Sequence, residues 1–301
     1  MVGKQGPDMI GAGAIFIDDI VLPDGQTHMG QLGGGTVHAL MGAVLWGERP
    51  GLSAYVGQGL PADVLPRLRR HLDTQGIVRL GVPQMRAWQL FEHDGTRREV
   101  HRVDVIAPFV TGTKPADLPG AYHEARAYYL LQDYAGIVTW QRQVDGMILW
   151  EPNALGMQPA YRDAFRAAVR DCPVTLISPN LQEAQTIYGR KSPDALLDAF
   201  FEDGAQAVAL RLGAAGSLVG QRSGGRWRVG AVPVREVIDQ TGAGNVYCGT
   251  LLCGLMRGKT LQAAAMMGAV AASFCVETIG VLEPASIDPA ERNRRYRALL
   301  T

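Results

Sequence analysis

The chain has 301 residues, 47% of them hydrophobic and 19% charged, which is enough for one large hydrophobic core. Lysine plus arginine equals aspartate plus glutamate at 29 each, so no net field favours nucleic acid or an anionic membrane surface. No apolar run of about 18 residues predicts a membrane span, the N-terminal segment lacks the apolar stretch of a signal peptide, and the four cysteines without metal-ligand or CxxC spacing favour a reducing cytoplasm.

Short apolar runs bounded by glycine or proline recur along the chain and predict buried strands. Helical spacing of apolar residues lies between them, first at 37–45 and then at 64–72, where Pro61 suits a first-turn position. This alternation predicts an α/β fold with a largely parallel sheet covered on both faces. The predicted strands are Met9 to Phe16, Leu52 to Val56, Tyr128 to Leu131, Met147 to Trp150, Val174 to Ile177 and Ala207 to Leu212.

Consecutive glycines precede the first predicted helix, in the run QLGGGTVHALMGAVLW from Gln31 to Trp46. They would let a ligand approach the backbone closely, and His38 follows on the first helical turn. A lone histidine is more often a packing or capping residue than a ligand or base, although it titrates near neutral pH. A second pattern, from Gly57 to Ala62, fits a dinucleotide fingerprint, but Pro61 interrupts it and no acidic residue follows about 20 positions on. A dinucleotide oxidoreductase would rest on this weak pattern alone.

Residues Arg86 to Val103 depart from the alternation of strands and helices. Polar and apolar residues alternate in two segments on either side of Asp94 and Gly95, which is typical of a β-hairpin. A hairpin inserted into an α/β domain is a candidate lid over a binding site. The alternative is an edge hairpin with no role in closure.

The run SPNLQEAQTIYG sets Asn180 and Glu183 three residues apart at the start of a predicted helix, so both side chains can point to one side. An amide and a carboxylate in this arrangement suit a hydrated Mg²⁺ beside phosphates. The pair also fits a capping box, and both interpretations can hold together. Further on, LRLGAAGSLVG places Gly213 and Gly216 after a predicted strand, where they border either a nucleotide or a plain β-turn.

The run Asp239 to Asn245 reads DQTGAGN and precedes a helix predicted from Val246 to a stop at Gly258. Such a turn gathers backbone N–H groups that can hold a phosphate. The alternative is a glycine loop between a strand and a helix, with Asn245 as an ordinary N-cap. An aspartate at position 245 could take the proton of a substrate hydroxyl, whereas Asn245 can position a group but cannot act as a base. No P-loop pattern occurs, which excludes a P-loop kinase at the motif level.

In this order, the segments resemble the PfkB (ribokinase-like) family of small-molecule kinases over nearly the whole chain. The family signature looks like DTTGAGD, so Asn245 stands where its catalytic aspartate is usual, as in a divergent branch of the family. Gly33 to Gly35 match the glycines of the N-terminal signature, with His38 in place of an asparagine that contacts the sugar. Asn180 and Glu183 match its N-x-x-E element.

The resemblance implies a ribokinase-like fold, in which a mostly parallel sheet is flanked by helices in three Rossmann-like layers. One domain would span 1–301, with small β lid elements at about 18–32 and 84–108. ATP, Mg²⁺, a monovalent cation such as K⁺ and a hydroxylated substrate would bind it. The implied substrate-binding residues are Asp18, Gly34, Gly35, His38 and Asp133, and the implied residues on the nucleotide side are Asn180, Glu183, Gly213, Gly216 and Thr241. The resemblance places Glu183 and Asp239 near a metal ion. The residues that it places at the transferred phosphoryl group are Gly242, Ala243, Gly244 and Asn245.

Two hypotheses of function follow. The first is an ATP-dependent kinase of a sugar, polyol or nucleoside whose base is unassigned, with His38 and Asp133 as candidates. The second, motivated by Asn245, is a non-catalytic PfkB-like protein that binds nucleotide or sugar as a sensor or partner subunit. In either case we expect a cytoplasmic protein that binds neither nucleic acid nor membrane. The lid hairpin could pair with its twin in a homodimer, or be covered within the monomer.

Overall fold

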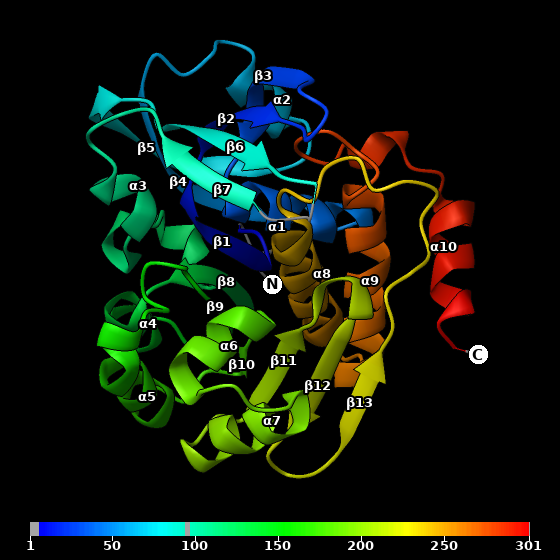
Figure 1. The fold of residues 1–301 in the computed structure, drawn as a ribbon. Coiled ribbons are helices and arrows are strands. Elements are labelled where there is room, and N and C mark those ends of the chain that lie inside the picture. Colours follow the sequence, from blue (N-terminus) through cyan, green and yellow to red (C-terminus); the bar gives the residue numbers. More distant parts are fainter. Residues whose placement is uncertain (1–5, 94–96, 301) are drawn as a thin grey trace, which may run out of the picture.

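The computed structural model describes residues 6–93 and 97–300, which form a large sheet, a small sheet and the helices around them (Figure 1). Within these ranges the large sheet has nine strands in the order β13-β12-β11-β10-β9-β8-β1-β4-β5, and all neighbours are parallel except at β11–β12 and β12–β13. The predicted mostly parallel sheet is therefore confirmed. The strands are β1 (Met9–Ala14), β4 (Gly51–Gln58), β5 (Asp73–Pro83), β8 (Ala127–Gln132), β9 (Met147–Pro152), β10 (Leu176–Ile177), β11 (Ala207–Arg211), β12 (Ser217–Gln221) and β13 (Arg226–Val229).

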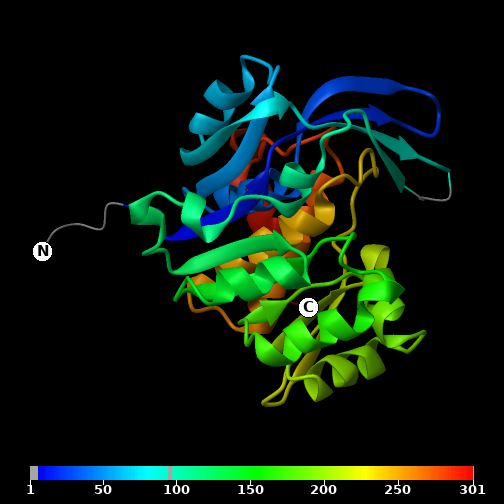
Figure 2. The ribbon, with the colours of Figure 1, turned by 90° about the vertical axis from the view of Figure 1, so that its left-hand side faces the viewer.

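Helices cover both faces of the large sheet (Figure 2). Because side chains alternate along a strand, Met9 and Tyr129 face one hydrophobic core whereas Ile10 and Tyr128 face the other. The first core packs against α1 (Gly35–Leu45), α2 (Val64–Arg69), α8 (Ala243–Met256), α9 (Leu261–Cys275) and α10 (Pro289–Ala298), and the second against α4 (Tyr134–Gln141), α5 (Arg162–Asp171), α6 (Leu181–Tyr188) and α7 (Pro193–Glu202).

Two helices begin where the sequence did not place their start. Helix α2 starts at Val64, so Pro61 precedes it and accepts a hydrogen bond from the Val64 N–H instead of occupying the first turn. Helix α8 starts at Ala243, three residues before the predicted Val246. Its N-cap, Gly242, has a left-handed conformation (φ 75°) that redirects the chain early.

The small sheet has the strand order β3-β2-β6-β7 and consists of β2 (Phe16–Val21), β3 (Thr27–Gly33), β6 (Arg86–Phe91) and β7 (Arg97–His101). Strands β6 and β7 are antiparallel, which confirms the hairpin predicted over Arg86 to Val103. The predicted turn at Asp94 and Gly95 lies outside the described residues. Strand β1 passes through Ile15 into β2, so the small sheet stands over the carboxyl end of the large sheet.

The remaining elements are short. They are α3 (Ala107–Thr111) and the 3-10 turns η1 (Pro115–Asp117), η2 (Gly120–Tyr122), η3 (Pro159–Tyr161), η4 (Gly213–Ala215) and η5 (Pro284–Ser286). Across 6–93 and 97–300, no helix combines the length and the apolar character needed to cross a bilayer.

Candidate active site

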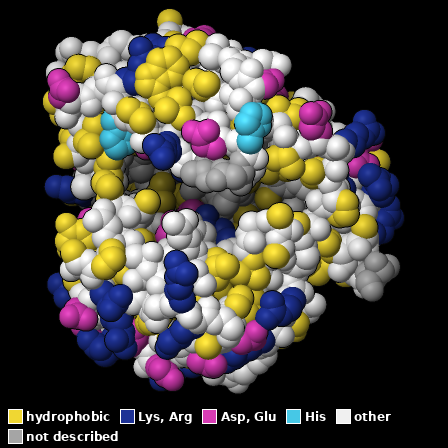
Figure 3. All heavy atoms as spheres, in the orientation of Figure 1, with side chains coloured by type: hydrophobic (Ala, Val, Ile, Leu, Met, Phe, Trp, Pro, Cys, Tyr) yellow, Lys and Arg dark blue, Asp and Glu magenta, His cyan; other side chains and the backbone are white. Residues whose placement is uncertain are grey.

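A cavity of about 490 Å³ lies between the carboxyl ends of β8, β9 and β11 and the small sheet. It opens as a hollow between the upper and lower parts of the molecule (Figure 3). Carboxyl ends of parallel strands are the usual ligand site of open α/β sheets. The cavity brings together ten of the predicted residues, namely Asp18, Gly34, Gly35, His38, Asn180, Glu183, Thr241, Gly242, Gly244 and Asn245.

Five predicted residues do not line this cavity: Asp133, Gly213, Gly216, Asp239 and Ala243. Asp133 is the N-cap of α4 and accepts a hydrogen bond from the Gly136 N–H at 2.7 Å, so it serves the helix. Gly213 and Gly216 both have positive φ and form the tight turn between β11 and β12. That turn adjoins the cavity only through Arg211, the last residue of β11.

Asp239 fixes the start of the glycine turn. Its Oδ1 accepts a hydrogen bond from the Thr241 N–H at 2.8 Å, and its Oδ2 accepts one from the Gly280 N–H at 2.9 Å. The buried carboxylate thus ties the turn to the loop after α9.

Asp18 forms the acidic end of the cavity, on β2. Its Oδ1 accepts a hydrogen bond from Gln89 Nε2 on β6 at 3.1 Å. Burial raises the pKa of Asp18 to about 7, against the opposing effect of that hydrogen bond. A buried carboxylate with spare acceptor capacity is suited to binding the hydroxyl groups of a ligand.

His38 lies beside this end, on α1, and is only 1% exposed. Within the described part of the chain neither ring nitrogen has a hydrogen-bond partner. Burial, assisted by the charge of Arg97, lowers the pKa of His38 to about 4, so the ring is neutral at pH 7. A neutral imidazole has one donor and one acceptor, and here both ring nitrogens are buried without a partner among the described residues.

The first turn of α8 forms the opposite wall. Gly244 and Asn245 occupy the second and third helical positions, where backbone N–H groups have no partner within a helix. The N–H of Ala243 instead bonds to the carbonyl of Gln240 at 3.3 Å. Together with the helix dipole, the N–H groups of Gly244 and Asn245 are suited to binding an anion such as a phosphate.

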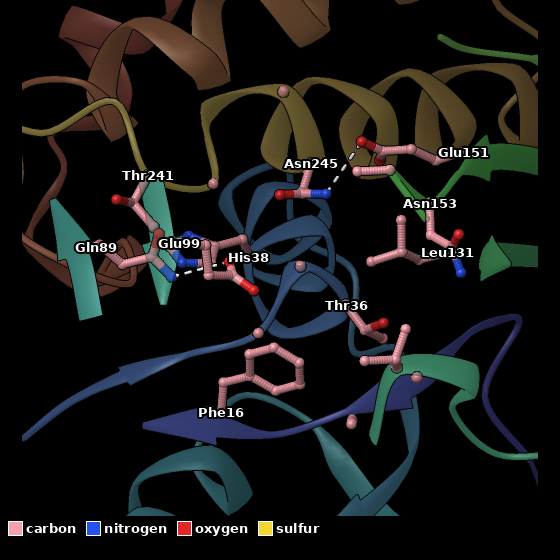
Figure 4. A pocket seen from close by; sticks show the side chains of 18 of the residues that line it. Phe16, Thr36, His38, Gln89, Glu99, Leu131, Glu151, Asn153, Thr241 and Asn245 are labelled. Carbon is pink, nitrogen blue, oxygen red and sulfur yellow. Dashed lines mark hydrogen bonds between the residues drawn. The ribbon is translucent and has the colours of Figure 1, made fainter. Parts of the chain in front are cut away.

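Asn245 is not the N-cap, so the alternative that made it an ordinary cap is wrong. Its Nδ2 donates to Glu151 Oε1 at 3.0 Å and to the hydroxyl of Tyr129 at 3.2 Å. The amide oxygen points the other way, to the side on which Thr241 and His38 lie (Figure 4).

Glu151 and Arg211 complete this wall, and the sequence analysis missed both. Glu151 is 3% exposed, pairs with Arg211 Nη1 at 2.7 Å through Oε1 and accepts from the Tyr129 hydroxyl at 2.6 Å through Oε2. Arg211 Nη2 lies 3.6 Å from Glu183 Oε2. Burial acts to lower the pKa of Arg211, but the surrounding groups, of which Glu151 acts most strongly, together outweigh it and hold this pKa above its usual range.

Asn180 and Glu183 form the capping box of α6. Asn180 Oδ1 accepts from the Glu183 N–H, and Glu183 Oε2 accepts from the Asn180 N–H, both at 2.8 Å. No donor among the described residues contacts Glu183 Oε1, and the carboxylate lines the cavity. Burial raises the pKa of Glu183.

A magnesium ion fits this donor set. The described residues contain no group of three or more histidine, cysteine, aspartate or glutamate side chains able to hold a metal by themselves. Mg²⁺ commonly takes one or two carboxylates and completes its shell with water and phosphate oxygens. Glu183, whose carboxylate lines the same cavity as Gly244 and Asn245, would be its protein ligand.

Some of the residues that the sequence analysis missed could have been found from a sequence pattern. Glu151 and Arg211 are charged residues that directly follow the apolar runs MILW and AVAL, at strand ends where ligands bind. Tyr129 had none, because it lies inside a buried strand. Gln89, Arg97 and Glu99 of the hairpin also line the cavity. The alternating sequence of a strand does not say which of its two faces points toward the cavity.

The nine-stranded sheet and the small sheet above its carboxyl end define a ribokinase-like α/β fold. Residues 138–288, half of the chain, match the family described as pfkB family carbohydrate kinase, and the chain belongs to this family. The expected family and fold class are thus confirmed.

Individual relatives agree with this assignment. A cytidine kinase of Thermococcus kodakarensis is 23% identical over 267 residues, which cover 87% of this chain and 93% of the relative. The structure of a probable sugar kinase of Rhizobium etli has a TM-score of 0.78 at 18% identity and covers 96% of this chain and 99% of its own. Arabidopsis thaliana ribokinase, solved with ribose and ATP, has a TM-score of 0.76 at 15% identity, with coverages of 97% and 99%.

Proposed function

We propose that this chain transfers the terminal phosphoryl group of ATP to a hydroxyl group of a small metabolite, such as a sugar, polyol or nucleoside. One observation carries the proposal: a single cavity holds a buried carboxylate suited to hydroxyl groups, Asp18, and the free N–H groups at the start of α8. The family description and the names of the relatives, a cytidine kinase and a ribokinase bound to ribose and ATP, support the same class.

Asp18 and His38 would bind the substrate. Asp18 accepts hydrogen bonds from hydroxyl groups, and the neutral His38 ring can both donate and accept. Leaving two buried ring nitrogens unpaired is costly, so a polyhydroxylated ligand would gain affinity by satisfying them.

The first turn of α8 would hold the phosphoryl group during transfer. The N–H groups of Gly244 and Asn245 and the helix dipole stabilise negative charge there. A bond forms between the substrate oxygen and phosphorus while the bond from phosphorus to the ADP oxygen breaks, and its electron pair leaves with ADP. Asn245 can accept a hydrogen bond from the attacking hydroxyl but cannot take its proton. In a loose transition state this proton can pass late to an oxygen of the transferred group and then to water.

Mg²⁺, held through Glu183 and water, would neutralise charge on the phosphates. The turn of Gly213 and Gly216, two residues beyond Arg211, is our candidate border of the nucleoside part of ATP. Asp239 is the candidate neighbour of a K⁺ ion, and replacing K⁺ by tetramethylammonium in the assay tests this assignment.

The second candidate is a protein that binds nucleotide or sugar without turnover, acting as a sensor or a partner subunit. It is favoured by the amide of Asn245, because the loss of a general base costs roughly 10² to 10⁴-fold in rate.

Incubation of the purified protein with ATP, Mg²⁺ and a panel of sugars, polyols and nucleosides separates the two candidates. Substrate-dependent ADP release that Gly244→Val abolishes supports the kinase. Binding of ATP and a panel member by calorimetry, without any release of ADP, would leave the sensor as the function.

A further inference from the structure

The orientation of the Asn245 amide is fixed by its neighbours. Nδ2 donates to Glu151 Oε1 at 3.0 Å and to the Tyr129 oxygen at 3.2 Å. The Tyr129 oxygen acts as an acceptor here because its own proton is donated to Glu151 Oε2. A flipped amide would set its oxygen against the Glu151 carboxylate. The carbonyl Oδ1 must therefore face the cavity (Figure 4).

We infer that Glu151 is a positioning residue for the transfer reaction: it holds the Asn245 amide so that Oδ1 accepts the hydrogen bond of the attacking hydroxyl. This inference rests on the proposed phosphotransfer. Glu151 supplies a carboxylate next to position 245, where the side chain itself is an amide.

Glu151 is poorly placed to act as the base itself. Oε1 is shared by Arg211 Nη1 at 2.7 Å and Asn245 Nδ2, and Oε2 accepts from Tyr129 at 2.6 Å. These three donors occupy both carboxylate oxygens, so neither oxygen is left to meet the hydroxyl of a substrate. Its contribution is orientation, because a hydroxyl aligned with phosphorus reacts faster without a change in substrate binding.

The arrangement makes Asn245 and Glu151 a matched pair. An aspartate at position 245 would place a second carboxylate about 3 Å from Glu151, and two such groups share a proton instead of both ionising. In Asn245→Asp combined with Glu151→Gln, the amide and the carboxylate exchange places. The glutamine amide of this double variant can donate to the new carboxylate, which then stands free at the cavity as a base.

The experiment is a double-mutant cycle on E151Q, N245D and E151Q/N245D, measured both as Tm in the ligand-free protein and as kcat and KM. We expect each single variant to lower Tm by roughly 5 °C or more and the double variant to return within about 2 °C of the wild type. E151Q should lower kcat at least roughly tenfold while the KM for ATP stays unchanged, and the double variant should exceed the wild-type kcat by roughly 10 to 10²-fold.

N153D is the matched control. Asn153 also lines the cavity, but its Oδ1 accepts from the Gly156 N–H at 2.9 Å and is not bonded to Glu151. N153D/E151Q adds charge to the same cavity without restoring the pair, so it should recover neither Tm nor kcat.

Additive losses of Tm in the main cycle, or a wild-type kcat in E151Q, would overturn the inference. Failure of the proposed function looks different: no variant and no wild-type protein would transfer phosphate to any panel member. A coupled Tm cycle in that case would retain Glu151 as the residue that orients the Asn245 amide toward a bound ligand, in a protein that is not a kinase.

Discussion

The guanidinium of Arg211 packs so closely against Gly244 that a Cβ on this glycine would lie 2.2 Å from Nη1. The same Nη1 is bonded to Glu151 at 2.7 Å, so it cannot move away without breaking a buried ion pair. Glycine at position 244 therefore lets a buried cation lie against the first turn of α8, and a side chain at position 244 would be costly.

Gly244→Ala should destabilise the protein by about 1–3 kcal/mol, because the methyl group overpacks against Arg211. In an ordinary helix the same change stabilises by about 0.5–1 kcal/mol, so even the sign is diagnostic. Urea denaturation measures it. Gly230→Ala is the control, since nothing lies within 4 Å of a Cβ there and its φ is not positive. Equal stability of the two variants would contradict the packing.

Asp18→Asn should change how stability depends on pH. Burial raises the pKa of Asp18 from 3.8 to about 7 in the folded protein, so ionisation opposes folding. Relative to the variant, the wild type should therefore lose stability as pH rises from about 4 to 7, on the order of 4 kcal/mol in total. Denaturation at several pH values tests this. Asp24→Asn, the same substitution at an exposed position, is the control.

His38→Leu should separate stability from binding. Removing a buried ring whose nitrogens lack partners should stabilise the free protein by about 1 kcal/mol at pH 7. The stability advantage of the variant should increase as pH falls from 6.5 toward 4. Burial lowers the pKa of His38 in the folded protein to about 4, so protonation in this range favours the unfolded wild type. The KM of the hydroxylated substrate should rise about tenfold or more. A stability loss with unchanged KM would mean that His38 serves packing instead.

The fold could be predicted because its signals are local and repeated. Apolar runs such as Met147 to Trp150 and the alternating arms of the hairpin each specify a strand, and strand–helix alternation then implies a parallel sheet. Helix starts were less well predicted. The position of α8 depends on the left-handed conformation of Gly242, which a run of glycines permits but does not locate.

Half of the candidate site was equally accessible from the sequence, since Asn180, Glu183 and the glycine turn lie in contiguous motifs. The other half depends on contacts between distant segments. Glu151 meets Asn245 across 94 residues of sequence, and no local pattern encodes that contact. Asp133 shows the converse, because a polar residue at a strand end can equally serve as a helix cap.

The small sheet leads us to predict a homodimer. Strands β3 and β7 are its outer strands, and each carries an exposed apolar residue, Met29 and Val100, both 46% exposed. Outer strands with exposed apolar side chains favour pairing with another chain. Sedimentation should give a dimer that Val100→Lys weakens at least about tenfold. Val237→Lys, at a position 53% exposed outside this sheet, is the control. A monomer at all concentrations would rule the dimer out.

The apolar wall of the cavity predicts a preference among the substrates. Its larger apolar residues are Phe16, Phe109, Val110, Leu131 and Leu155, and Figure 4 shows Phe16 close to His38. With a free pentose bound, these apolar side chains would stay in contact with water. The base of a nucleoside could instead pack on the Phe16 ring, which would strengthen binding by about 1–1.5 kcal/mol. Phe16→Ala should then raise the KM of a nucleoside roughly tenfold and leave that of the corresponding pentose unchanged. An equal rise for both would show that Phe16 shapes the cavity without contacting a base, and the substrate would be a sugar or polyol.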